Sequence, residues 1–109
     1  PSAGIALAVA LMGAISGKAP IPKLALTGEI TVQGEVRPVG GVAEKLDAAI
    51  QGGAHTVLIP KANWEEAYAS LPCDVIPVED IAQTLRLAFD IPYELTVTEG
   101  VIPLLYTTA

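Results

Sequence analysis

A continuous apolar run at residues 56–59 constrains the fold of this chain more than any other stretch. Its sequence is Thr56-Val57-Leu58-Ile59, and Pro60 ends it. A run this short that does not alternate with polar residues is typical of a strand buried on both faces. Such a strand needs packed helices as well as neighbouring strands. The run therefore predicts a central strand that is covered on both of its faces.

Helical spacing of apolar residues predicts four helices, over residues 3–15, 42–51, 63–71 and 79–89. The first stretch is apolar almost all round, which indicates a helix buried on most sides. Ser2 stands at its N-cap position, and Gly17 stands where a helix ends. Asn63 is expected to cap the third helix, whose Trp64 and Tyr68 then face the core or an interface.

Further strands are predicted at residues 24–26, 29–32, 35–39 and 73–78. Gly28 and Gly34 lie at bend or turn positions between the first three, so the stretch as far as residue 39 is interpreted as a β-hairpin. Residues 94–99 alternate polar and apolar positions, and residues 101–106 are apolar again. This last stretch is either a hairpin added to the sheet or a tail that binds a partner.

Composition excludes several classes of function. The net charge is −6, and an acidic chain without a basic patch repels nucleic acid and anionic membranes at long range. Cys73 is the only cysteine, so an internal disulfide and a cysteine-based zinc site are excluded. A Ser-His-Asp triad would have to use His55, the only histidine, which is expected to lie on the surface. The apolar run near the start is too short to span a bilayer, and it lacks the basic start of a signal peptide.

Lys45 occupies an unusual position on the helix predicted over residues 42–51. At 100° per residue the apolar stripe contains Val42 and Leu46, and Lys45 falls at the edge of that stripe. An amine at the margin of a core is partly desolvated, loses its proton more readily, and can serve as a general base. The alternative is a lysine whose stem covers apolar surface while its ammonium remains in water.

Several blocks, in their order along the chain, closely resemble the proteolytic domain of the Lon proteases. They are Pro1-Ser2-Ala3-Gly4, Leu26-Thr27-Gly28-Glu29-Ile30-Thr31, the stretch from Gly34 to Lys45, Ala48-Ala49-Ile50-Gln51-Gly52-Gly53 and Val57-Leu58-Ile59-Pro60-Lys61. The resemblance implies the fold of that family, which is of the α+β class: a ribosomal-protein-like two-layer α/β sandwich with a mixed sheet and packed helices. It also implies a serine endopeptidase that hydrolyses peptide bonds through a Ser-Lys dyad.

The resemblance assigns a role to three residues. The family's nucleophilic serine falls on Ser2, its general-base lysine on Lys45, and its supporting threonine on Thr27. A serine hydroxyl attacks once a neighbouring base takes its proton, and a neutral lysine amine can do this without a histidine. Free backbone amides at a helix start, here those of Ser2 and Ala3, can stabilise the oxyanion. An amine of the N-terminal Pro1 acting in catalysis is a further alternative.

The resemblance covers residues 1–89, and residues 90–109 are interpreted as a C-terminal extension. The leading strands of the family domain are missing, so the chain is expected to be a fragment, a cleavage product or one piece of a split domain. No cofactor is expected in this chain, and ATP and Mg²⁺ would act only through an ATPase module of the parent protein.

The expected partners are protein or peptide substrates, the missing N-terminal part of the domain, and the other copies in a homo-oligomeric ring. By resemblance this ring is a hexamer. Nucleic acid and membrane are not among the expected partners, and a prokaryotic cytoplasm is the expected location. The alternative function is a non-catalytic Lon-like domain for assembly or partner binding.

Overall fold

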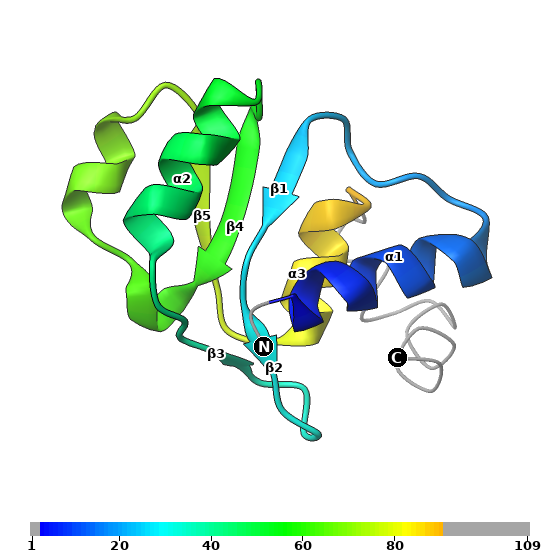
Figure 1. The fold of residues 1–109 in the computed structure, drawn as a ribbon. Coiled ribbons are helices and arrows are strands. Elements are labelled where there is room, and N and C mark those ends of the chain that lie inside the picture. Colours follow the sequence, from blue (N-terminus) through cyan, green and yellow to red (C-terminus); the bar gives the residue numbers. More distant parts are fainter. Residues whose placement is uncertain (1–2, 91–109) are drawn as a thin grey trace.

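A computed structural model describes residues 3–90 of the chain (Figure 1). Ser2 and the stretches expected at residues 94–99 and 101–106 lie outside the described residues. In chain order the elements are α1 (Gly4–Ser16), β1 (Leu24–Leu26), β2 (Glu29–Ile30), β3 (Val36–Arg37), α2 (Val42–Gln51), β4 (Thr56–Pro60), the 3₁₀ helices η1 (Lys61–Asn63) and η2 (Glu66–Ser70), β5 (Asp74–Val78) and α3 (Ile81–Ala88).

The strands form two small sheets. One is a parallel sheet of three strands in the order β1-β4-β5, and the other is an antiparallel pair of β2 and β3. The expected hairpin is confirmed for β2 and β3, with Glu29 opposite Arg37. Its strands are shorter than predicted, and β1 pairs with β4 instead of entering the hairpin. The α+β class holds, but two separate sheets take the place of one mixed sheet.

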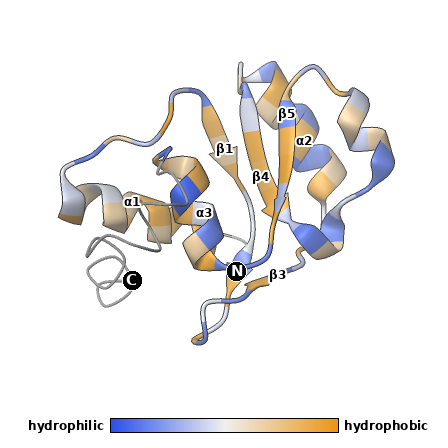
Figure 2. Ribbon diagram, turned by 180° about the vertical axis from the view of Figure 1, so that it is seen from behind, coloured by the Kyte–Doolittle hydropathy of each residue, from blue (hydrophilic) through white to orange (hydrophobic). Residues whose placement is uncertain are grey.

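The strand β4 lies at the centre and is covered on both faces, as the apolar run predicted. Val57 and Ile59 pack with α2 residues on one face, and Leu58, which is 0% exposed, packs with Ile5 and Val78 on the other. Figure 1 shows α2 on one side of β4 and β5, and α1 and α3 on the other side. Hydrophobic colours run along β4 and β5 in Figure 2. Helices therefore cover both faces of the parallel sheet, rather than forming one second layer.

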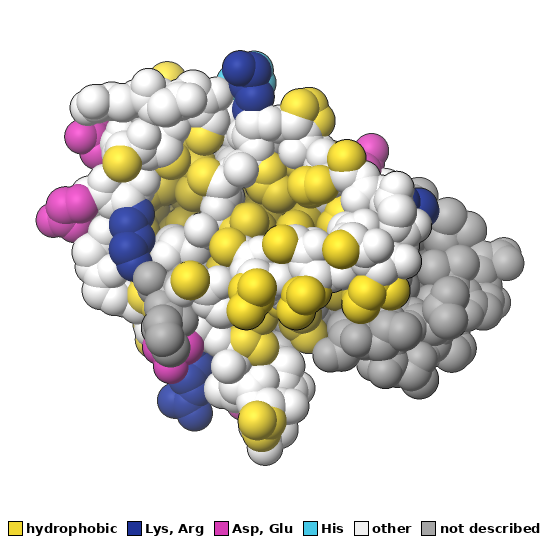
Figure 3. All heavy atoms as spheres, turned by 45° about the vertical axis from the view of Figure 1, so that its right-hand side comes forward, with side chains coloured by type: hydrophobic (Ala, Val, Ile, Leu, Met, Phe, Trp, Pro, Cys, Tyr) yellow, Lys and Arg dark blue, Asp and Glu magenta, His cyan; other side chains and the backbone are white. Residues whose placement is uncertain are grey.

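The helix α1 differs from the expectation that it is buried on most sides. Its buried residues are Ile5, Val9 and Met12, which face α3 and the sheet. Its opposite face carries Leu7, Leu11 and Ile15, which are 60%, 55% and 63% exposed. We call these three residues the outer face of α1, and hydrophobic side chains gather around it in Figure 3. The prediction was wrong because α1 packs along one side only, and no element among residues 3–90 covers the other.

Only the C-terminal end of α1 agrees with the prediction from the sequence. Gly17 ends the helix in a left-handed conformation with φ of 72°, and its N–H donates to the Gly13 carbonyl, as predicted. The N-cap position falls on Ala3 instead of Ser2, and no side chain caps it. None of the helices within residues 3–90 is long and apolar enough to cross a membrane.

The prediction of one helix over residues 63–71 is wrong. Trp64 and Glu65 are extended, so the chain forms the two short helices η1 and η2 instead. Asn63 does not cap a helix, because its side chain binds the backbone of Val39. The expected packing is nevertheless confirmed for Tyr68, which is buried in the core against Trp64 with ring centroids 6.0 Å apart.

The last helix, α3, forms as its sequence predicts. Asp80 is the N-cap, and its carboxylate accepts a hydrogen bond of 2.8 Å from the Gln83 backbone N–H. Leu85 and Ala88 are buried against Val9 and Met12 of α1. The two helices therefore form one packed layer behind the parallel sheet.

Candidate active site

Lys45 and Thr27, which are 18 residues apart in sequence, meet in the structure. The Lys45 Nζ atom donates to the Thr27 Oγ1 atom at 3.5 Å, which is at the outer limit for a hydrogen bond. Lys45 comes from the first half of α2, and Thr27 directly follows β1. Two of the residues assigned by the family resemblance therefore lie together.

The exposure of the two side chains differs strongly. Thr27 is only 6% exposed, whereas Lys45 is an exposed residue. The contact between Lys45 Nζ and Thr27 is nevertheless partly buried, and the expected partial desolvation of the amine stays a prediction. Val42 and Leu46 turn toward β4, and the step of 100° per residue places Lys45 beyond that buried stripe. Only the tip of the lysine reaches back to the buried threonine.

Thr27 is fixed by its backbone. Its N–H donates to the Leu58 carbonyl at 3.0 Å, so the central strand holds it just beyond the end of β1. The next residue, Gly28, is closely packed, because an added Cβ atom there would lie 3.0 Å from Val36 Cγ1 and 3.4 Å from Ile5 Cγ2. A larger residue at position 28 would push apart the elements that surround Thr27.

The start of α1 lies beside the same segment. The Ile5 N–H donates to the Gly28 carbonyl at 3.1 Å, and an added Cβ atom on Gly4 would lie 3.4 Å from the Ile30 nitrogen. Ala3 is exposed at the N-cap of α1. Ser2, the residue before it, lies outside the described residues. The structure thus brings together Lys45, Thr27 and the first turn of α1.

The turn that leads into α2 has a glycine at the N-cap position of the helix. Gly41 is the N-cap with φ of 70°, a left-handed conformation that glycine adopts without strain. Its carbonyl accepts the Lys45 backbone N–H at 3.0 Å, in the first turn of the helix. Just before this turn, Asn63 makes two hydrogen bonds of 2.9 Å with the backbone of Val39. Sequence reasoning missed this residue's contact, because no local pattern pairs positions 24 apart.

The other reactive side chains in the described residues stand apart from this site. His55 is exposed, in agreement with the surface position expected for it. Burial raises the pKa of the Cys73 thiol, with a smaller contribution from the neighbouring Asp74, so the thiol is less readily ionised. Within residues 3–90 no group of three or more His, Cys, Asp or Glu side chains could hold a metal ion.

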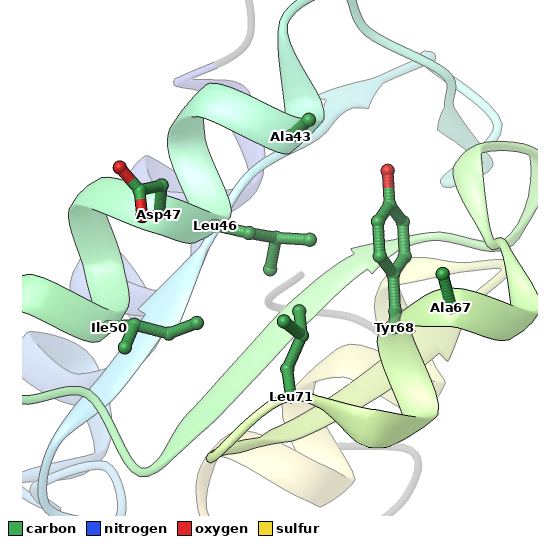
Figure 4. A pocket seen from close by; sticks show the side chains of 7 residues that line it. All are labelled: Ala43, Leu46, Asp47, Ile50, Ala67, Tyr68 and Leu71. Carbon is green, nitrogen blue, oxygen red and sulfur yellow. The ribbon is translucent and has the colours of Figure 1, made fainter.

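An apolar pocket of about 280 Å³ lies between α2 and η2, on a face of α2 that does not include Lys45. Figure 4 shows Leu46, Ile50, Leu71 and Tyr68 pointing into it. The Tyr68 hydroxyl donates to Glu65 Oε2 at 3.2 Å, and burial, followed by that hydrogen bond, raises the pKa of Tyr68. Neither Lys45 nor Thr27 is among the residues that line this pocket.

Comparison with known proteins gives a consistent result along the chain. The family model for the Lon protease (S16) C-terminal proteolytic domain matches residues 1–90. A Lon protease of Methanosarcina barkeri is 47% identical over 97 residues, which is 84% of this chain. A Lon protease of Escherichia coli strain K12 is 45% identical over 93 residues, 81% of this chain, and Lon protease 1 of Thermus thermophilus is 43% identical over 93 residues, 80% of this chain. The chain spans only 12% of the length of each of these relatives.

Proposed function

The chain belongs to the Lon protease (S16) C-terminal proteolytic domain family, and on that premise we propose that it is a serine-type endopeptidase with a Ser2-Lys45 dyad. Ser2 is the nucleophile, Lys45 is the general base, and Thr27 orients the lysine amine. The family is one of proteases, so the proposal concerns which residues of this chain perform the reaction.

The proposed reaction proceeds through an acyl-enzyme. The neutral Lys45 amine accepts the Ser2 hydroxyl proton while Oγ bonds to the carbonyl carbon of the scissile peptide. The tetrahedral intermediate carries an oxyanion that the backbone amides of Ser2 and Ala3 stabilise. When the carbon–nitrogen bond breaks, the leaving amine takes the proton from Lys45. Water then attacks the ester carbon while Lys45 accepts its proton. The bond between that carbon and Ser2 Oγ breaks, Oγ takes the proton from Lys45, and the carboxylic acid product leaves.

The observation that carries this proposal is the contact of 3.5 Å between Lys45 Nζ and Thr27 Oγ1 beside the first turn of α1. A threonine hydroxyl fixed by the central strand can aim a flexible amine toward one direction. The Ile5 N–H to Gly28 bond holds the start of α1 next to the residue that follows Thr27. Because Lys45 is exposed within the described residues, we propose that bound substrate or further parts of the parent protein cover the amine and remove water from it.

The whole protein is proposed to be larger and assembled. The relatives are long chains of which this sequence spans 12%. We propose that the part of the parent protein outside residues 1–109 covers the outer face of α1, and that the parent forms a homo-oligomeric ring in a prokaryotic cytoplasm. Its substrates are proteins or peptides, and ATP and Mg²⁺ act only through a separate ATPase module.

Labelling with a serine-directed fluorophosphonate tests the proposal in the full-length protein. The probe is expected to modify Ser2, identified by peptide mass, and Ser2→Ala is expected to abolish both labelling and casein cleavage. Cleavage by Ser2→Ala at the parental rate would show that the nucleophile is wrong. Absence of both labelling and cleavage in the parental protein would favour the alternative, a non-catalytic domain for assembly or partner binding.

A further inference from the structure

We propose that Asn63 is a positioning residue for Lys45. Its side-chain amide holds residues 38–41, the linker between β3 and α2, and thereby sets where the helix that carries Lys45 begins. The inference rests on the proposed role of Lys45 as the general base. It assigns a task to a residue whose sequence context suggests only a helix cap.

Both polar atoms of the Asn63 side chain bind the same backbone residue. The Val39 N–H donates to Asn63 Oδ1 at 2.9 Å, and Asn63 Nδ2 donates to the Val39 carbonyl at 2.9 Å. A carboxamide is able to accept and donate in this way, whereas a carboxylate only accepts. Two parallel bonds fix the direction of the linker as well as its distance from η1. The contact is partly buried, which protects it from competing water.

The linker needs such a restraint because its own residues supply little. Gly41 has φ of 70°, and an added Cβ atom on Gly40 would meet nothing within 4 Å. No side chain caps the N-terminus of α2. Glycine backbone has more conformational freedom than any other residue, so two successive glycines, one of them in open space, leave the helix start poorly determined. Val39 is the residue directly before them, and it is the one that Asn63 holds.

Two consecutive elements, β4 and η1, hold the segments on either side of the Lys45–Thr27 contact. The Leu58 carbonyl of β4 holds the Thr27 backbone, and η1, which carries Asn63, directly follows β4. Because the amine and the hydroxyl are already 3.5 Å apart, a small further displacement of α2 would break their contact. The Asn63 bonds keep the start of α2 in register with the strand that holds Thr27.

The variant Asn63→Leu in the full-length protein tests this role, because leucine has a similar volume and makes neither hydrogen bond. The kcat per folded site is expected to fall about 10- to 100-fold, the scale of a misplaced catalytic group, while KM for a short peptide is unchanged. The matched control is Gln51→Ala, which removes a side-chain hydrogen bond to Asp47 on the same helix and is expected to keep the parental kcat. A parental kcat in Asn63→Leu, or an equal loss in the control, would overturn the inference.

A second substitution separates positioning from general stability. Gly40→Ala restricts the same linker without a clash, so the double variant Asn63→Leu/Gly40→Ala is expected to recover part of the lost kcat. Amide hydrogen exchange of residues 39–45 is expected to be faster in Asn63→Leu and slower again in the double variant. A loss of kcat that Gly40→Ala does not change at all would mean that Asn63 acts through folding alone, and the inference would be wrong.

Two further variants complete the test. If Asn63→Leu does not fold, Asn63→Asp keeps the acceptor for Val39 N–H and loses the donor, so a smaller fall in kcat is expected. A parental kcat in that variant would contradict the inference. Lys45→Ala identifies which proposal has failed. If the Lys45→Ala variant is active, both the dyad and the positioning role are refuted. If Lys45→Ala is inactive while Asn63→Leu is fully active, the positioning role alone is refuted.

Discussion

Replacing Thr27 by valine or by serine separates its proposed catalytic task from its packing task. Valine keeps the shape of threonine and removes the hydroxyl to which Lys45 Nζ donates at 3.5 Å. Serine keeps the hydroxyl and removes a methyl group from a side chain that is only 6% exposed. The two variants are therefore expected to change different quantities.

The magnitudes follow from these contacts. One neutral hydrogen bond contributes about 0.5–1.5 kcal/mol, so its loss in Thr27→Val should lower kcat about 2- to 12-fold with little change in stability. Loss of one buried methyl group in Thr27→Ser should cost about 0.5–1.5 kcal/mol of unfolding free energy, with kcat nearly unchanged.

The assay is peptide hydrolysis by the full-length protein at saturating substrate, combined with thermal unfolding followed by circular dichroism. The rate gives the catalytic effect, and the unfolding transition gives the stability of the same sample. Parental kcat in Thr27→Val would refute the idea that the hydroxyl orients the amine. A fall in kcat for Thr27→Ser as large as that for Thr27→Val would show that packing, and not the hydroxyl, is what matters at this position.

Three further predictions concern single sites. Lys45→Arg keeps the charge but stays protonated, so hydrolysis should fall at least about 10³-fold, while Lys61→Arg retains the parental rate. Gly28→Ala should lower the unfolding free energy by about 1–3 kcal/mol in chemical denaturation, because its Cβ atom meets side chains from 3.0 Å outward, whereas Gly40→Ala should not. Because burial raises the pKa of Cys73, iodoacetamide should modify it more slowly in the folded than in the unfolded protein at pH 8.5, and equal rates would contradict this.

Features decided by a few adjacent residues could be predicted from the sequence. The apolar run at residues 56–59 forms the central strand β4, Gly17 ends its helix as expected, and the helix predicted over residues 79–89 forms with Asp80 as its N-cap. These are local effects, because the conformational freedom of glycine and the reach of a carboxylate to an amide three residues on depend on nearby backbone alone. The family blocks likewise identified the proposed site residues, whose roles stay predictions.

Other features were decided by tertiary structure. The apolar residues of α1 do not say which of them meet a partner, and Leu7, Leu11 and Ile15 are exposed because residues 3–90 provide no cover for them. In the same way, the spacing from Trp64 to Leu71 suits a helix, but Asn63 satisfies the backbone of Val39 and the chain is extended at Trp64 and Glu65. The spacing of apolar residues depends on one segment alone, whereas the residues that pack against that segment come from other parts of the chain.

The surroundings of Lys45 show most clearly which features the sequence alone does not determine. The sequence by itself determined the type of residue and its place beside an apolar stripe, and it carried the family blocks around it. Only the tertiary structure decided that the amine reaches Thr27 and that the side chain is otherwise exposed. The physical reason is that Thr27 is held by Leu58 of β4 and Val39 by Asn63 of η1, through hydrogen bonds between residues 31 and 24 positions apart in the chain. Such distant contacts exist only once the chain has folded.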